Sequence, residues 1–411
     1  MNPLVHKRPF KPGIDWVYYA PHTTTVFDEA EISAVVASLR GGWLGTGPIT
    51  QKFEDAVARL FGKKYGLFVN SGSSANLLSM LACHFKKGSE VITPSCTFNT
   101  TVAPIIQAGL KPVLIDVLPG QYVVDPKELT KALSKKTVAM LIPHLIGNFA
   151  DLSALRAFCK KHKLILVEDS CDTIGGTYHN KPSGAFADIT TTSFYASHII
   201  TAGGSGGMIM SDDKELIHRA RVIASWGRGI KGYTDSIEDR LSAYRVDGEP
   251  YDSAFVFVEK GYNFKPTEMQ AAFGLQQLKR LKQFTAHRQR AFKKLLTFFS
   301  AYEDLFILPK EQPYSKTHWL AFPLTIKPGA SFTRNELVTY LEHHKVQTRP
   351  IFSGNIVKHE AYPKGSYRAV GSLKHSQQIL HNGLLIGAHH GLSDPMLRHM
   401  CDTLRNFLKT Y

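Results

Sequence analysis

Two adjacent carboxylates end the apolar run LILVEDS (164–170) and are the first candidates for chemistry in this sequence. Burying a carboxylate is costly unless a cation or hydrogen-bond donors meet it. Glu168 and Asp169 therefore predict either a helix cap or surface-facing pair, or a site in which one of them meets a protonated ring nitrogen. Pyridoxal cofactors supply such a nitrogen.

A second candidate is the stretch NSGSSAN (70–76), which runs from an apolar segment directly into a predicted helix. Its small residues let backbone amides approach an anion, and the start of the helix adds the positive end of its dipole. The stretch predicts either a phosphate site or an ordinary turn capped by serine. Phe98, which ends the run EVITPSCTF (90–98), could stack on a flat ring or pack in a core.

Strands and crossover helices must position these groups, because short β-rich runs alternate with helical periods from residue 65 to residue 213. Seven runs are predicted to be strands: 65–71, 90–98, 111–117, 137–145, 164–170, 189–197 and 207–213. Their near-continuous apolar character is typical of a mostly parallel sheet with helices on both faces. Helices are predicted at 74–85, 125–134 and 151–162, the last two opened by an aspartate. In such sheets, ligands bind beyond the carboxyl ends of the strands.

The remainder of the chain predicts a smaller second domain of the α+β class. Residues 228–262 are polar and aromatic without periodicity and predict a functional or interface loop. Residues 266–300 read as one long helix with Pro266 in its first turn. From about residue 317 the pattern is strand (318–326), helix (334–344), strand (346–352) and helix (376 onward). We expect a large domain over 1–300 and a small domain over 301–411.

Composition excludes several classes of protein. The chain has 411 residues, of which 43% are hydrophobic and 20% charged, so it is neither disordered nor fibrous. Its formal charge of +15 has no clustered basic-aromatic pattern, which disfavours nucleic acid and leaves a solvated surface or a phosphorylated small molecule. Five cysteines at irregular spacing, a polar start (1–10) and no apolar run of about 18 residues predict a cytoplasmic protein away from membranes.

The segment SFYASH (193–198), followed by GGSGG (203–207), completes a series of motifs that resembles a known family. The other members of the series are WLGTGP (43–48), SGSSANL (71–77), VEDS (167–170), GYN (261–263) and EMQAA (268–272). In this order they are similar to the DegT/DnrJ/EryC1/StrS nucleotide-sugar aminotransferases. The resemblance implies an α/β fold of type I among pyridoxal-phosphate enzymes, with a seven-stranded, mostly parallel sheet in the large domain.

The resemblance also implies roles for individual residues. Three serines would hold the cofactor phosphate: Ser73, Ser74 and Ser193. Phe98 would stack on the cofactor ring, and Asp169 would pair with the ring nitrogen. Asp172 would face the ring hydroxyl. Asn263 would reach the phosphate bound by a neighbouring subunit, which implies a homodimer with shared active sites.

One position departs from the aminotransferases of this family. They carry a lysine that forms a Schiff base with the cofactor, whereas this chain has His198, and no other lysine occurs between Thr190 and Met210. The histidine resembles a branch of the family, the 4-keto-6-deoxyhexose 3-dehydratases, in which pyridoxamine phosphate is bound without a covalent bond. Deoxygenation at C3 needs a base with a pKa near neutrality, a property of histidine. We therefore expect His198 to act as base and then as acid.

Within this branch, one type carries a [2Fe–2S] cluster, which needs about four thiolates. No cysteine lies between Cys171 and Cys401, so an iron–sulfur cluster is not expected. The resemblance then implies the other type, which acts on GDP-4-keto-6-deoxymannose for 3,6-dideoxyhexose (O-antigen) synthesis, with L-glutamate regenerating the cofactor's amine. Arg349 is a candidate partner for an acidic group of glutamate or of the sugar diphosphate.

Three other functions stay open: a nucleotide-sugar aminotransferase, a CDP-sugar 3-dehydratase, and a relic that binds the cofactor without activity. The GGSGG segment replaces a family pattern that has a glutamate within its glycine pair, so a different local backbone is expected there. Four histidines could line the cleft or be ordinary packed residues: His144, His318, His389 and His390.

Overall fold

The computed structural model describes residues 9–21, 26–229 and 237–411. The first eight residues of the polar start and residues 230–236 of the predicted loop lie outside the described residues. Within the described ranges, no helix is both long and apolar enough to cross a membrane.

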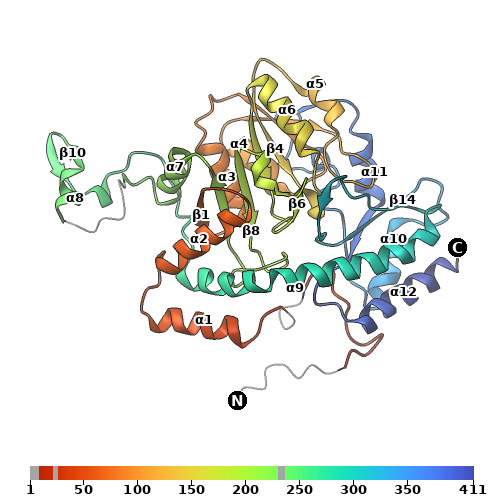
Figure 1. Cartoon of the computed structure of the whole chain (residues 1–411). Helices are drawn as coiled ribbons and strands as arrows, with labels where there is room; N and C mark the ends of the chain where they lie inside the picture. The colour runs from red at the N-terminus through yellow and green to blue at the C-terminus, as the bar shows by residue number, and fades with distance from the viewer. Residues whose placement is uncertain (1–8, 22–25, 230–236) are drawn as a thin grey trace.

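An eight-stranded sheet forms the centre of the molecule, in the order β1-β9-β8-β5-β4-β2-β3-β16 (Figure 1). All seven predicted strands are present: β1 (Tyr65–Val69), β2 (Glu90–Pro94), β3 (Lys111–Ile115), β4 (Thr137–Pro143), β5 (Ile165–Asp169), β8 (Ile189–Ser193) and β9 (Gly207–Ser211). The eighth, β16 (Arg368–Ala369), is a short edge strand from the C-terminal part of the chain. Only β9 runs antiparallel to its neighbours in this sheet, so the carboxyl ends of the other strands meet at one edge.

Helices cover both faces of this sheet, as its apolar strands require. They include α2 (Pro48–Leu60), α3 (Gly72–Leu81), α4 (Asn99–Gln107), α6 (Leu152–His162) and α7 (Lys214–Ala224). The predicted cap of α6 is present, because Asp151 accepts a hydrogen bond from the Ala154 amide. The helix predicted over 125–134 is shorter than expected, with one 3-10 turn (Pro126–Glu128) followed by α5 (Leu129–Ala132).

The long helix α9 (Glu268–Phe299) runs beside the sheet toward the C-terminal part of the chain (Figure 1). It begins two residues later than predicted, because Thr267 and Gln270 form a capping box at its start. Pro266 therefore precedes the helix and does not lie in its first turn, which corrects the prediction.

The first residue of α9 also caps a different helix. The buried Glu268 carboxylate accepts hydrogen bonds from the amides of Gly47 (2.9 Å), Ile49 (2.6 Å) and Thr50 (3.1 Å) at the start of α2. These amides have no partner within their own helix, and a carboxylate there also meets the positive end of the helix dipole. The contact explains why WLGTGP and EMQAA occur together in one sequence.

We expect Glu268→Ala to lower the free energy of unfolding by about 2 kcal/mol or more, because three buried or part-buried amides lose a charged acceptor. Urea unfolding followed by circular dichroism measures the change. Glu336 is a matched control, since it caps α10 (Arg334–His343) from an exposed position. Glu336→Ala should cost clearly less; equal losses in the two variants would argue against a special role for Glu268.

The C-terminal part contains a four-stranded sheet in the order β12-β14-β17-β15. Its strands are β12 (Phe306–Ile307), β14 (Phe322–Ile326), β17 (Gly383–Ile386) and β15 (Thr348–Arg349), covered by α10, α11 (Lys374–Asn382) and α12 (Asp394–Leu408). The prediction of a continuing helix after residue 376 was wrong, because α11 ends at Asn382 and GLLI forms the fully buried strand β17. Short apolar runs do not distinguish strand from helix by periodicity.

The core of this C-terminal part includes residues from far earlier in the chain. Phe322, Leu384 and Ile386 pack with Leu295 from α9 and with Val17 from the N-terminal segment. The domain boundary at residue 300 stays a prediction. Val17 and Leu295, which precede this boundary in the sequence, pack in the core of the C-terminal part.

The loop that carries Phe98 is attached to the C-terminal part by hydrogen bonds. The Ser353 amide donates to the Thr97 carbonyl (3.2 Å), and the Ile356 amide donates to the Ser95 carbonyl (2.9 Å). The Ser95 hydroxyl donates to that of Ser376 at 2.6 Å. Two parts of the chain that are distant in sequence thus form one wall.

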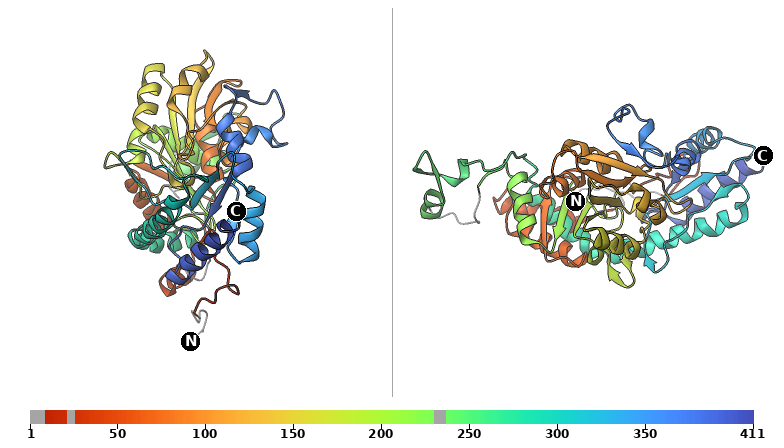
Figure 2. Two further views of the ribbon diagram at one scale, coloured as in Figure 1. Left: turned by 90° about the vertical axis from the view of Figure 1, so that its right-hand side faces the viewer. Right: turned by 90° about the horizontal axis from the view of Figure 1, so that it is seen from above.

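Much of the predicted loop forms an arm (residues 226–229 and 237–262) that projects from the body of the molecule (Figures 1 and 2). It contains α8 (Ile237–Ser242) and the hairpin of β10 (Tyr244–Val246) and β11 (Glu249–Tyr251). At its base Gly227 and Gly261 lie backbone to backbone, and a Cβ on Gly227 would lie 1.8 Å from the Glu259 carbonyl oxygen. Only glycine fits at this crossing.

Candidate active site

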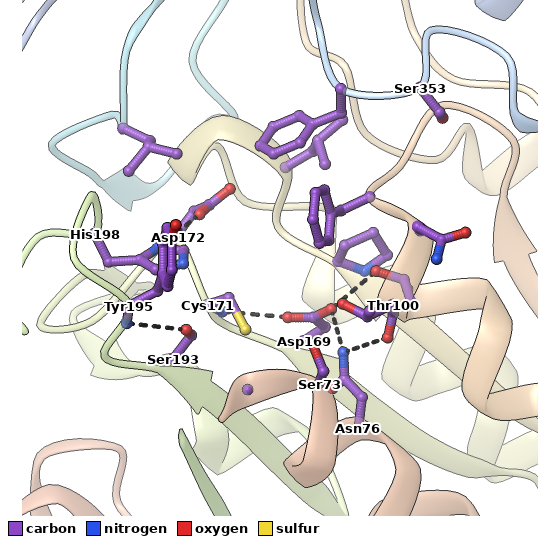
Figure 3. A pocket seen from close by; sticks show the side chains of 18 of the residues that line it. Ser73, Asn76, Thr100, Asp169, Cys171, Asp172, Ser193, Tyr195, His198 and Ser353 are labelled. Atoms are coloured by element: carbon purple, nitrogen blue, oxygen red, sulfur yellow. Dashed lines mark hydrogen bonds and ion pairs between the residues drawn. The ribbon is translucent and has the colours of Figure 1, made fainter. Parts of the chain in front are cut away.

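A cavity of about 710 Å³ opens at the carboxyl edge of the central sheet and is closed on its far side by the C-terminal part (Figure 3). Its walls come from the ends of β5 and β8, the turn before α3, the loop before α4 and the segment after β15. Seven of the nine predicted site residues line it: Ser73, Phe98, Asp169, Asp172, Ser193, His198 and Arg349. Ser74 and Asn263 do not.

Asp169 lies at the end of β5 and is held by groups from other elements. Its Oδ2 accepts hydrogen bonds from Asn76 Nδ2 (2.8 Å) and Thr101 Oγ1 (3.0 Å), and Oδ1 accepts from the Cys171 amide (3.3 Å). The side chain is almost fully buried yet lines the cavity. Its charge is therefore available to one cationic group from the cavity side.

Glu168 points to the other face of the sheet, as alternation along a strand requires. Burial alone would raise the pKa of Glu168, but the neighbouring His144, with the Ser170 hydroxyl, holds that pKa below its usual value. The ring of His144 is fixed on both sides, since Nδ1 accepts from the Ala150 amide (3.2 Å) and Nε2 lies 3.4 Å from Glu168. The two adjacent carboxylates thus have separate partners.

The serine turn (residues 71–74), which caps and begins α3, presents small groups to the cavity. Ser73 lines it, while the Ser74 hydroxyl donates to Asn70 Oδ1 at 2.7 Å within the turn. Gly72 must be small, because a Cβ there would lie 2.7 Å from Cβ of Ser193. The start of α3 and the hydroxyls of Ser73 and Ser193 therefore share one corner of the cavity.

Two aromatic rings form the wall that joins the two parts of the chain. Phe98 is 52% exposed, and its ring meets that of Phe352 edge to face, with centroids 5.9 Å apart. An exposed phenylalanine in a cavity wall offers a flat apolar surface for a planar ligand.

His198 lies in the turn after β8, opposite this wall. Its backbone amide donates to the Tyr195 carbonyl (3.0 Å), and its side chain is 16% exposed. Nδ1 lies 3.3 Å from Asp172 Oδ1, which is within ion-pair distance but lacks the alignment of a full hydrogen bond. His198 thus lines the cavity, and its role as base and acid stays a prediction.

Arg349, on β15, contributes a cation to the mouth of the cavity. Its guanidinium lies 4.9 Å from the ring centre of Tyr19, another residue of the lining. Asn263 is exposed near the base of the arm, where its Oδ1 accepts from the Lys265 amide (3.4 Å). Its side chain is therefore presented to the outside of the molecule.

Of the four histidines left open by sequence, only His144 lines the cavity. His318, His389 and His390 are buried close to the guanidinium of Arg288. Burial, together with the charge of Arg288, lowers the pKa of His318 and of His389 to about 3 and lowers that of His390 as well. All three are neutral packed residues at pH 7.

Three glycines of the GGSGG segment have a left-handed or otherwise positive-φ backbone, while the expected difference from the family stays a prediction. Gly203, Gly204 and Gly206 all have positive φ, and the Ser205 hydroxyl donates to the Asn70 carbonyl at 2.6 Å. Ser205 and Gly206 line the cavity. The segment therefore links the His198 turn to the serine turn.

Among the lining residues that were not assigned roles from sequence are Tyr19, Asn76, Thr101 and Phe352. Asn76 belongs to the serine motif, and its position one helical turn past Ser73 was a usable signal. Thr101 follows Phe98 by three residues. Tyr19 and Phe352 had no local signal, because the fold alone brings them to the cavity.

The donor set fits a pyridine ring bearing a phosphate group. A carboxylate with one free direction, a flat aromatic wall and a helix start flanked by hydroxyls are the three contacts such a cofactor requires. With the mostly parallel sheet and the cavity at its carboxyl edge, they define a pyridoxal-phosphate enzyme of fold type I.

The chain belongs to the DegT/DnrJ/EryC1/StrS aminotransferase family, which it matches over residues 26–405. It is 34% identical to dTDP-4-dehydro-2,6-dideoxy-D-glucose 3-dehydratase from Saccharopolyspora spinosa, over 93% of this chain and 85% of that protein. It is also 34% identical to lipopolysaccharide biosynthesis protein RfbH from Salmonella typhimurium, over 99% and 95% of the two chains. A solved structure of GDP-4-keto-6-deoxymannose-3-dehydratase with a trapped PLP–glutamate geminal diamine is similar, with a TM-score of 0.83, 28% identity and coverage of 94% and 100%.

Proposed function

We propose that this protein is a pyridoxamine-phosphate-dependent 3-dehydratase of a nucleotide-linked 4-keto-6-deoxyhexose. The observation that carries the proposal is His198 in the cavity wall, in a site where no lysine is among the lining residues that the structure describes. Two similar proteins are named as sugar 3-dehydratases. An aminotransferase of the usual kind would need a lysine there.

Each residue has a part in this reaction. When bound, the cofactor supplies an amine that condenses with the C4 ketone and a ring that accepts electrons. Asp169 would hold the ring nitrogen protonated, Ser73 and Ser193 would hold the phosphate, and Phe98 would cover the ring. Ser74 lies outside the cavity lining and its hydroxyl donates to Asn70, so it is not proposed as a phosphate ligand. His198 takes up a proton and returns it to the C3 hydroxyl, which departs as water.

The substrate we propose is GDP-4-keto-6-deoxymannose, for a 3,6-dideoxyhexose of a surface polysaccharide. Two similar proteins support it, one named for this sugar nucleotide and the other for lipopolysaccharide biosynthesis. We propose L-glutamate as the donor that restores the cofactor's amine, since the first of these was solved with a PLP–glutamate adduct. Arg349 would receive a carboxylate of glutamate or the sugar diphosphate.

The test is an incubation of the purified protein with pyridoxamine phosphate, glutamate and the GDP-, CDP- or dTDP-linked sugar, analysed by mass spectrometry. We expect a product that lacks one oxygen, together with 2-oxoglutarate and ammonia, and the largest yield with the GDP sugar. An amino sugar as product would make the protein an aminotransferase, and bound cofactor without turnover would make it an inactive relic.

We propose that the protein works as a homodimer, with the arm of each copy laid on the other. The arm, which projects from the body of the molecule (Figure 2), exposes the apolar side chains of Phe255 and Phe257 (each 60% exposed) and Val258 (51%). Exposed apolar surface of this kind marks an interface, and self-complementary dimers are the commonest assembly. Asn263, at the base of the arm, would reach the phosphate site of the second copy.

The double variant Phe255→Asp/Phe257→Asp should therefore elute as a monomer in size-exclusion chromatography with light scattering. We also expect weaker cofactor binding, because each site would lose Asn263 of the other copy. Tyr314→Asp is the control, since Tyr314 is 73% exposed but lies outside the arm. A double variant that remains dimeric would contradict this use of the arm.

We propose the cytoplasm as the place of action. All five cysteines are free in the structure, which is the usual state in a reducing compartment. Reactivity of these thiols in protein isolated under alkylating conditions would test this proposal.

A further inference from the structure

We propose that Asp172 is a positioning residue for His198. Its carboxylate keeps the ring proton on Nδ1, so that Nε2 is the free base in the cavity. The inference rests on the proposed function only in naming the reaction in which this base acts. The pairing itself is a property of the protein without substrate.

The geometry of the pair is specific. Asp172 Oδ1 lies 3.3 Å from His198 Nδ1, and the Asp172 side chain is 9% exposed. Nδ1 is buried and has no hydrogen-bond partner among the described residues. Asp172 is therefore the group that fixes the proton on this nitrogen, and a small ring rotation completes the hydrogen bond.

The other oxygen of Asp172 is held by a strained turn. Oδ2 accepts from the Ile146 amide at 3.0 Å, and Ile146 has φ of 59° and ψ of 14°, a left-handed conformation that is costly for a β-branched residue. The next residue, Gly147, is packed so closely that a Cβ there would lie 3.0 Å from the Asp172 carbonyl oxygen. The strained backbone of this turn therefore places the Ile146 amide against the Asp172 carboxylate.

A buried cation lies behind the pair. Arg288 is fully buried, and its Nη1 donates to the carbonyls of Trp319 and Leu320 at 3.2 and 2.9 Å. Burial lowers the pKa of Arg288 to about 9, and the charge of Asp172 opposes that change. The negative charge of Asp172 therefore acts on a buried guanidinium as well as on the His198 imidazole.

This arrangement differs from the role that the family resemblance implies for Asp172, which is contact with the cofactor's ring hydroxyl. Both carboxylate oxygens already lie against protein groups, one toward Ile146 and the other toward His198. The two roles predict different consequences for the same substitution.

The deciding variant is Asp172→Asn, which keeps the shape of the side chain. We expect the new amide to donate to Nδ1 of His198, which moves the ring proton to Nε2 and removes the base. kcat should fall about 10²- to 10⁴-fold, while KM for the sugar nucleotide and the dissociation constant of pyridoxamine phosphate stay at their wild-type values.

A merely structural role of Asp172 would leave the tautomer of His198 unchanged. This tautomer is measured by ¹⁵N–¹H correlation NMR on the protein without substrate. The His198 signals are identified by their loss in His198→Asn. Wild-type protein should show the proton on Nδ1, and Asp172→Asn should show it on Nε2. His144 is an internal control, because the Ala150 amide fixes its Nδ1 as an acceptor in both proteins.

An unchanged His198 tautomer in Asp172→Asn would overturn the proposal, as would a kcat loss accompanied by weaker cofactor binding. Asp172→Ala provides a second variant if the first does not fold. There the ring is free to adopt either tautomer, so kcat should fall less than in Asp172→Asn; an equal or larger fall would count against the proposal. Since the tautomer is read without substrate, failure of the proposed reaction is distinguishable from failure of this pairing.

Discussion

Replacing His198 by asparagine should lower kcat for deoxygenation about 10²- to 10⁴-fold, the usual contribution of a positioned general acid or base. The asparagine amide fits the same space but does not accept a proton at neutral pH. Binding of pyridoxamine phosphate should be retained, because the ring-nitrogen, phosphate and stacking contacts come from other residues. Product formation and cofactor affinity, measured in parallel, separate these two effects.

His198→Lys is the complementary variant. A lysine at this position is expected to bind pyridoxal phosphate covalently, so the cofactor should remain attached after borohydride reduction and denaturation, as measured by mass spectrometry. Deoxygenation should be lost. If His198→Asn retained wild-type kcat, or if the lysine variant bound no cofactor covalently, His198 would not face the reacting atoms.

Replacing Asp169 by asparagine should weaken cofactor binding about 10²- to 10³-fold, because removing one partner of a buried ion pair costs about 3–5 kcal/mol. Asn76 and Thr101 already donate to the side chain at residue 169, so the new amide would also place donors opposite donors. Turnover should fall as well, since the ring nitrogen would lose the charge that favours its protonated form. Equilibrium dialysis with pyridoxamine phosphate measures the affinity.

Glu168→Gln is the matched control for this variant. It removes the neighbouring carboxylate, which lies on the other face of β5 beside His144. We expect lower thermal stability with the affinity for the cofactor kept. Equal losses of affinity in the two variants would show that Asp169 has no specific contact with the ring.

Seven strands of the central sheet were predictable from sequence, because they are largely buried and therefore appear as apolar runs, whereas the two-residue edge strand β16 is part-exposed and was not predicted. The same property explains the error at GLLI, a short apolar run that forms the strand β17, although the Asn382-Gly383 pair that opens it is a turn signal. The start of α9 was misplaced for a different reason. The Thr267 and Gln270 capping box sets it, so Pro266 is left outside the helix.

The site residues were predictable where they belong to one local motif. They were not predictable where elements distant in sequence contact one another. Asp169 and the serines at 71–74 were found because they lie at the ends of predicted strands, whereas His198 was found through the resemblance to the family. Asp169's partners Asn76 and Thr101, however, come from α3 and α4, and no period or spacing relates them to residue 169. The turn at Ile146, whose amide holds Asp172, contains Gly147 and Asn148, but nothing in the sequence indicates that Ile146 itself is left-handed.

The hydrogen bonds from Ser353 and Ile356 to the backbone of Thr97 and Ser95 have a mechanical consequence. Phe98 is one residue beyond Thr97, so a rotation of the C-terminal part would displace the ring that we propose covers the coenzyme. If the coenzyme is held only by noncovalent contacts of this kind, the movement that opens the cavity to a bulky sugar nucleotide also weakens the contacts to the coenzyme. Dissociation of the product and dissociation of the coenzyme would then depend on one movement, so the rate of one would limit the rate of the other.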